Sequence, residues 1–118
     1  VQHMIEAKWG RIIMLSSTRG IKGDVGISPY AISKSSLIGL SNSLSKEYAK
    51  FNITSNVINL GYFDSPLWKS IPENKRKQLI KQIPSKRPGT ADDLIPLFNC
   101  LIESNYINGA HIDLDGGL

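Results

Sequence analysis

Residues 10–17, with the sequence Gly-Arg-Ile-Ile-Met-Leu-Ser-Ser, are the stretch from which the fold of this chain can be derived. Gly10 interrupts the pattern before it, and Arg11 is followed by four consecutive apolar residues that end at two serines. A short continuous apolar run of this kind is typical of a strand buried on both faces, as in a parallel sheet. We therefore predict a strand at residues 11–15, preceded by the end of a helix at residues 1–8.

The sequence after this strand predicts helices and strands in alternation. After a loop at residues 16–28, Ser28 as N-cap and Pro29 at the first helical position begin a long helix that runs to about Lys50. The elements predicted beyond it are a strand at residues 53–59, an irregular segment at 60–72, a short basic helix at 73–83, a helix capped by Thr90, and a strand from His111 to Leu114. Pro96 is expected to kink the helix after Thr90 or to delay its regular start.

This order of elements implies an α/β fold in which three parallel strands are flanked by helices. Strands that alternate with helices are joined by right-handed crossovers, which place the helices on the faces of a parallel sheet. Ligands of such sheets bind beyond the carboxyl ends of the strands. In this sequence those ends are residues 16–17, 59–61 and 115–117, so we expect a binding site there.

The overall composition excludes several classes of protein. The 118 residues are 41% apolar and 20% charged, which is typical of a folded globular segment rather than a disordered or fibrous chain. No apolar stretch approaches the ~20 residues of a membrane span, so we expect no membrane partner. A single cysteine, Cys100, favours a reducing, cytoplasmic setting and a place in the core. His3 and His111 lack ligand spacing, so we expect no metal site.

The net charge of +4 is unevenly distributed along the chain. Residues 69–87 hold seven Lys and Arg against Glu73 alone, a net +6, which leaves −2 for the rest of the chain. Two interpretations remain open for this basic segment: a solvated helix and loop, or a docking surface for an anionic partner.

Three side chains that suit carbonyl chemistry are expected at the ligand-binding edge of the sheet. Tyr30 and Lys34 are four residues apart on one face of the predicted helix, and Ser17 lies 13 residues before Tyr30. An ammonium group near a phenol favours the phenolate, so Tyr30 can exchange a proton with a carbonyl or alcohol oxygen. Ser17 can donate a hydrogen bond to the same oxygen. A hydride carrier has to be a cofactor, because no side chain supplies hydride.

These motifs, taken in order, resemble the short-chain dehydrogenase/reductase family. The segments that carry the resemblance are residues 10–17, Tyr30-Ala31-Ile32-Ser33-Lys34, Asn56-Val57-Ile58-Asn59-Leu60-Gly61 with Ser65, Arg87-Pro88-Gly89, Tyr106-Ile107-Asn108-Gly109 and Asp113-Leu114-Asp115-Gly116-Gly117. They cover nearly all of the chain, and within the family they are most similar to 3-oxoacyl-acyl-carrier-protein reductases and acetoacetyl-CoA reductases.

The resemblance implies a role for each of the three side chains. Tyr30 is expected to be the catalytic acid or base, and Ser17 to position and polarise the substrate carbonyl. Lys34 is expected to favour the Tyr30 phenolate and, with Tyr30, to contact the nicotinamide ribose.

Further cofactor contacts follow from the same resemblance. Gly61 and the backbone of Phe63 are expected to line the nicotinamide, and Ser65 to lie near its carboxamide and diphosphate. Residues 62–87 are expected to form the substrate lid. Leu60 stands where the family has proline, so we expect a looser turn there. The cofactor is NADP or NAD, and this part of the sequence does not distinguish the two.

The resemblance also implies that residues 1–118 are the C-terminal catalytic half of one Rossmann-type, doubly wound domain. No glycine-rich dinucleotide fingerprint follows a strand in these residues, so we expect the N-terminal half that carries this fingerprint to lie upstream. The predicted strand at 11–15 would pair with a strand from that half. We therefore expect the 118 residues alone to be inactive and to self-associate.

The function that the resemblance implies is NAD(P)-dependent interconversion of a carbonyl and a secondary alcohol. The expected substrate is a small carbonyl or alcohol compound, foremost a 3-oxoacyl thioester on acyl carrier protein or CoA. The alternatives are a sugar, polyol or other small-alcohol dehydrogenase of the same family, and a catalytically silent, protein-binding remnant. Nucleic acid is not an expected partner, because the basic segment has few aromatics. The helix at residues 30–50 is expected to form a homo-oligomer interface, as in the family.

Overall fold

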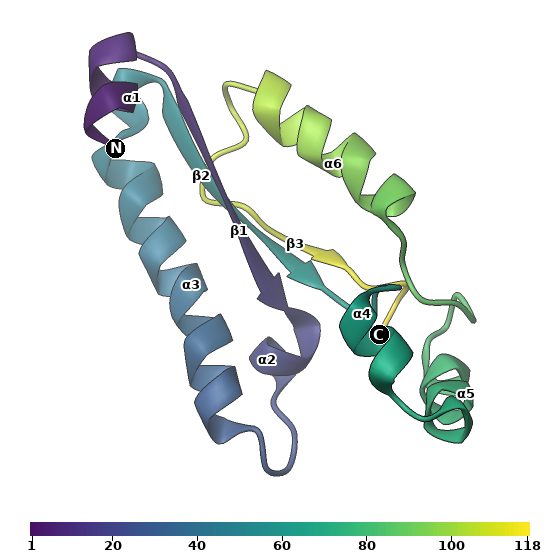
Figure 1. The fold of residues 1–118 in the computed structure, drawn as a ribbon. Helices are drawn as coiled ribbons and strands as arrows, with labels where there is room; N and C mark the ends of the chain where they lie inside the picture. Colours follow the sequence, from purple (N-terminus) through teal and green to yellow (C-terminus); the bar gives the residue numbers. More distant parts are fainter.

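The computed structural model covers residues 1–118 and contains one parallel sheet of three strands in the order β1-β2-β3 (Figure 1). The strands are β1, Gly10–Ser17, β2, Ile53–Leu60, and β3, His111–Leu114. Their register places Ser17 beside Leu60 and Leu60 beside Leu114, so the carboxyl ends of all three strands meet at one edge. The predicted α/β class is thus confirmed, and β1 and β2 are each longer than predicted.

Six α-helices and one 3-10 turn accompany the sheet. They are α1 (Gln2–Ala7), α2 (Thr18–Lys22), α3 (Ser28–Glu47), the 3-10 turn η1 (Ala49–Phe51), α4 (Pro66–Ser70), α5 (Glu73–Gln82) and α6 (Ala91–Glu103). Figure 1 shows α3 along one side of the sheet and α6 on the other, with α5 projecting away from the sheet. None of these helices is long and apolar enough to cross a membrane.

The central strand β2 is buried along almost its whole length, although half of its residues are polar. Its polar side chains hold the neighbouring segments in place. The hydroxyl oxygens of Ser55 and Ser41 on α3 lie 3.0 Å apart. Asn56 donates to the Ile107 carbonyl at 2.9 Å and accepts from the Ala110 amide at 2.9 Å. These bonds satisfy buried polar groups and fix the loop that leads into β3.

Two short helices, α2 and α4, were not predicted from the sequence. Each is stabilised by a serine at its N-cap. The segment predicted as a loop contains α2, where Ser17 Oγ accepts a hydrogen bond from the Gly20 amide. The segment predicted as irregular contains α4, where Ser65 Oγ accepts from the Trp68 amide and Pro66 occupies the first turn.

Helix ends also differ slightly from the prediction. Ser28 is the first residue of α3 and Ile27 is its N-cap, without a side-chain bond, so the predicted capping role of Ser28 is wrong. The long helix stops at Glu47, short of Lys50. Thr90 caps α6 as predicted, and α6 runs on through Pro96.

Cys100 is exposed, which corrects the prediction of a core thiol. The neighbouring Leu101 is the fully buried residue of α6. Since successive helix residues are rotated by about 100°, the buried position of Leu101 turns Cys100 away from the sheet.

Candidate active site

A cavity of about 880 Å³ lies at the carboxyl ends of β1 and β2. All six residues proposed from the sequence line it, namely Ser17, Tyr30, Lys34, Gly61, Phe63 and Ser65. They come from β1, from α3, and from the segment after β2, so parts of the chain up to 48 residues apart meet there. The structure thus brings the predicted residues together, while their chemical roles stay predictions.

Ser17 is the last residue of β1 and is only 9% exposed. Its Oγ accepts a hydrogen bond from the Gly20 amide at 3.4 Å as it caps α2. That bond uses a lone pair of the hydroxyl and leaves its hydrogen free to be donated. The strand end and the cap therefore hold a hydroxyl donor at the cavity.

Tyr30 and Lys34 occupy successive turns of α3, as their spacing predicts. Tyr30 is 44% exposed, and the Lys34 ammonium lies 6.0 Å from the centre of the Tyr30 ring. The ammonium donates a hydrogen bond to the Leu15 carbonyl at 3.0 Å, which anchors α3 to β1. Two ammonium hydrogens remain for other acceptors.

Gly20 on α2 lets α3 pack closely against α2. A Cβ at Gly20 would lie 2.6 Å from Lys34 Cβ. The Gly20 carbonyl also accepts a hydrogen bond from Ser35 Oγ at 3.2 Å. The position of Lys34 relative to Ser17 therefore depends on a glycine that sequence reading did not single out.

Gly61 directly follows β2, and its amide donates to the Leu114 carbonyl at 3.0 Å. A Cβ at Gly61 would lie 2.7 Å from Asp115 Cα, so only glycine fits without moving the backbone. The looser turn expected at Leu60 stays a prediction. Leu60 is the last residue of β2, and its carbonyl accepts a hydrogen bond from Thr18 Oγ1 at 2.9 Å.

Phe63 and Ser65 belong to the start of the lid segment, residues 62–87. Phe63 pairs with Gly89 in an isolated parallel bridge, and its ring lies 2.8 Å from where a Gly89 Cβ would be. Phe63 therefore packs at the base of the lid segment as well as lining the cavity. Ser65 Oγ caps α4 as an acceptor, at 3.2 Å from the Trp68 amide, and keeps a hydrogen to donate.

The lid segment carries the basic residues that the sequence placed there. Trp68 is 6% exposed and packs against Tyr62 with ring centres 5.5 Å apart. On α5, Lys77 pairs with Glu73 at 2.7 Å, whereas Lys75 and Lys81 are exposed and have no acidic partner. α5 therefore presents uncompensated positive charge beside the cavity, which Gln82 at its end helps to line.

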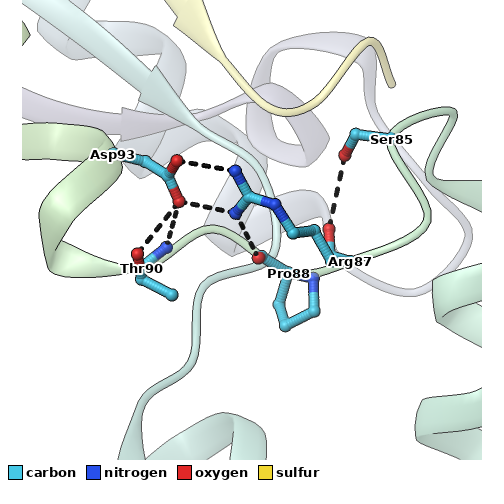
Figure 2. A network of polar contacts seen from close by, with 5 residues as sticks. All are labelled: Ser85, Arg87, Pro88, Thr90 and Asp93. Atoms are coloured by element: carbon cyan, nitrogen blue, oxygen red, sulfur yellow. Dashed lines mark hydrogen bonds and ion pairs between the residues drawn. The ribbon is translucent and has the colours of Figure 1, made fainter.

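The far end of the lid segment is fixed by a charged network at the start of α6 (Figure 2). Arg87 donates to both carboxylate oxygens of Asp93, each at 2.7 Å, and the Thr90 amide donates to Asp93 at 2.8 Å. The Arg87 guanidinium, followed by the Thr90 amide, holds the pKa of Asp93 well below its ordinary value. We call the Arg87–Asp93 pair the lid anchor.

Thr18 and Lys22 of α2 are among the cavity-lining residues that sequence reading missed. Both lie in a stretch that was predicted as loop. Thr18 contacts the end of β2, and Lys22 contacts residues that follow β3. Only the folded sheet brings these segments together, so no local sequence signal could have found them.

Comparison with known proteins finds a matching family and relatives along the whole chain. A family profile described as enoyl-(acyl carrier protein) reductase matches residues 1–118. The chain is 35% identical to the 3-oxoacyl-[acyl-carrier-protein] reductase FabG of Chlamydia muridarum, over 100% of this chain and 48% of that protein. It is 36% identical to FabG of Thermotoga maritima, over 100% and 49%. It is 34% identical to the reductase MabA of Mycobacterium tuberculosis, over 94% and 46%. The chain thus spans about half the length of these relatives.

Proposed function

Since the chain belongs to the short-chain dehydrogenase/reductase family, we propose that it carries the catalytic centre of an NAD(P)-dependent oxidoreductase. The reaction proposed is interconversion of a carbonyl and a secondary alcohol, with a 3-oxoacyl thioester as the substrate. The observation that carries this proposal is the meeting of Ser17, Tyr30 and Lys34 at one cavity.

Each of the three side chains has a task that its surroundings allow. The Ser17 hydroxyl donates to the substrate carbonyl oxygen, since its hydrogen is not used in the bond that its Oγ accepts from the Gly20 amide. The exposed Tyr30 phenol gives a proton to that oxygen during reduction and takes it back during oxidation. The Lys34 ammonium supports the phenolate from the next turn of α3.

The residues present fit the nicotinamide end of the cofactor. Lys34 has two ammonium hydrogens left for ribose hydroxyls, and the Ser65 hydroxyl can still donate. Gly61 offers a stretch of backbone without a side chain beside the cavity. When bound, the cofactor supplies or accepts the hydride.

The substrate class follows from the lining of the cavity and from the charge beside it. Apolar side chains such as Ile27, Leu67 and Ile71 line part of the cavity, which suits an acyl chain. The unpaired Lys75 and Lys81 on α5 suit an anionic carrier, either acyl carrier protein or CoA. The names of the relatives support the carrier protein.

The test is a turnover assay on the protein expressed from its natural gene, with NADPH and NADH in turn. A small 3-oxoacyl thioester should be reduced, and Tyr30→Phe should lower kcat by about 1,000-fold, because it removes the proton donor. Tyr62→Phe is the matched control, since Tyr62 lines the same cavity without a proposed proton role. Its kcat should stay within about threefold of the parent.

The same assay separates the alternatives. A small-alcohol dehydrogenase would oxidise sugars, polyols or simple alcohols faster than it reduces the thioester. A silent, protein-binding remnant would turn over none of these compounds. Equal loss in the Tyr30→Phe and Tyr62→Phe variants would contradict the role of Tyr30.

We further propose that the sheet continues beyond β1. β1 pairs only with β2, so its other edge is free, and Leu15 on β1 is 41% exposed and Trp9 just before β1 is 49% exposed. A free, partly apolar edge of this kind can pair with another strand.

In this proposal residues 1–118 are the C-terminal catalytic half of one domain. Produced alone, they should sediment as oligomers or aggregates and show no useful NADH or NADPH binding by fluorescence titration. A monomer with micromolar affinity for either would refute this.

Self-assembly through α3 is proposed as well. Ile32 is 71% exposed and Leu40 is 48% exposed on this helix, and a Cβ at Gly39 would meet no atom within 4 Å. A second copy packed along this face would bury these apolar side chains. Sedimentation of the parent and of a Leu40→Glu variant tests it, because the charge should dissociate the oligomer.

A further inference from the structure

Helix α2 connects the ends of all three strands. It follows β1 directly, and Thr18 Oγ1 donates to the carbonyl of Leu60 at the end of β2. At its other end, the Lys22 ammonium donates to the backbone carbonyl of Leu118 and lies 4.0 Å from a carboxylate oxygen of Asp115, which follows β3. The helix is only five residues long, so these side chains, and not its length, hold it in place.

Asp115 is the residue through which Lys22 can act on the site. Its side chain is 8% exposed, and one carboxylate oxygen accepts from the Gly117 amide at 2.9 Å. Lys22 is the cation paired with it. A carboxylate so largely removed from water is destabilised when its counter-charge is lost. Asp115 also abuts Gly61, where no Cβ can be accommodated.

The same contacts form part of the cavity wall. Lys22, Gly61 and Leu118 all line the cavity that holds Ser17, Tyr30 and Lys34. If residues 115–118 move away from α2, the wall beside Gly61 moves with them. The width of the cavity next to the proposed catalytic groups therefore depends on an ion pair between α2 and the segment after β3.

We propose that Lys22 is a positioning residue, whose ammonium holds residues 115–118 against Gly61 and thereby sets the fit of the substrate beside Ser17. Lys22 acts through Asp115 and the Leu118 carbonyl and does not contact the substrate. The kinetic part of this inference rests on the proposed carbonyl reduction, and its structural part does not.

The structural part is tested first, by hydrogen exchange of the protein expressed from its natural gene without substrate. Lys22→Met keeps the length of the side chain and removes its charge. The Gly117 amide, which donates to Asp115, should exchange about tenfold faster in this variant. Lys46→Met is the control, because Lys46 is an exposed cation on α3 without an ion-pair partner. Unchanged exchange at Gly117 in Lys22→Met would overturn the inference, whether or not the protein reduces a thioester.

The kinetic part uses a double-mutant cycle of Lys22→Met and Asp115→Asn with a small 3-oxoacyl thioester. Each single variant should raise KM about fivefold with kcat within about twofold, and the double variant should be no worse than either. Lys22→Arg should restore KM to within about twofold of the parent. Effects that multiply in the double variant would mean that Lys22 contacts the substrate itself, and would overturn the positioning role.

Discussion

The strand-end site and the lid segment line the same cavity, but they are held in very different ways. Ser17, Gly20 and Gly61 are fixed by backbone hydrogen bonds, a helix cap and close backbone packing at the ends of the strands. The lid segment, residues 62–87, is held at its start by the parallel bridge between Phe63 and Gly89 and at its end by the charged lid anchor. Between these points α5 has no buried residue.

This difference indicates that the strand-end site and the lid segment have different roles. The proposed catalytic groups lie where parallel strands fix positions through many short contacts, so small changes there should be costly. Within the lid segment, α5 can vary in sequence and charge because none of its residues is buried, and it is suited to selecting the substrate. Substitutions in the two regions should therefore have different consequences.

Two glycine substitutions compare the regions directly. Gly61→Ala places a methyl group 2.7 Å from the backbone of Asp115, and the free energy of unfolding should fall by about 1–3 kcal/mol. Gly89→Ala meets only the far end of the Phe63 ring, which can shift, so it should lose less than about 1 kcal/mol. Urea unfolding measures both. An equal loss at the two positions would remove the proposed contrast.

Charge reversal on α5 tests whether the lid segment selects an anionic carrier. With Lys75→Glu and Lys81→Glu together, kcat/KM for an acyl-carrier-protein thioester should fall by about three- to tenfold at low salt. It should not change for a small neutral thioester, because the strand-end site is intact. In the parent, kcat/KM for the carrier substrate should fall as ionic strength rises.

The matched control reverses two exposed cations away from the lid segment, Lys46 on α3 and Lys50 in η1. A carrier-specific loss in this control, with none in the α5 variant, would place carrier docking elsewhere. A kcat/KM for the carrier substrate that does not change with ionic strength would contradict an electrostatic role of α5.

The smallest expected effect concerns the lid anchor and pH. The pKa of Asp93 is lowered in the folded protein, chiefly by Arg87, so its ionised form stabilises the fold above its ordinary pKa of 3.8. That contribution is lost as pH falls toward the lowered value, because protonation breaks the pair with Arg87. The difference in urea midpoint between the parent and Asp93→Asn should therefore be constant near neutral pH and shrink below about pH 4. A difference that is independent of pH would mean that the anchor is not ionic.

The sequence was sufficient for much of the site because its signals are local. The apolar run before Ser17, the four-residue spacing of Tyr30 and Lys34, and the capping residue Thr90 depend on neighbours within one or two turns. The periodicities of strands and helices carry such signals. By contrast, the helices α2 and α4 and the exposure of Cys100 were missed. Short capped turns carry little periodic signal, and burial depends on which helix face meets the sheet.

The order of the elements, the parallel class of the sheet and the residues proposed for catalysis could all be read from the amino-acid sequence. The folded chain was needed to see which of these residues share a cavity, why Gly61 must lack a side chain, and that Lys22 reaches Asp115. The two kinds of information differ in their range along the chain. Spacing along the chain fixes the face of a helix or strand on which a side chain lies. Contacts across 93 residues, such as that from Lys22 to Asp115, exist only once the strands are aligned in register.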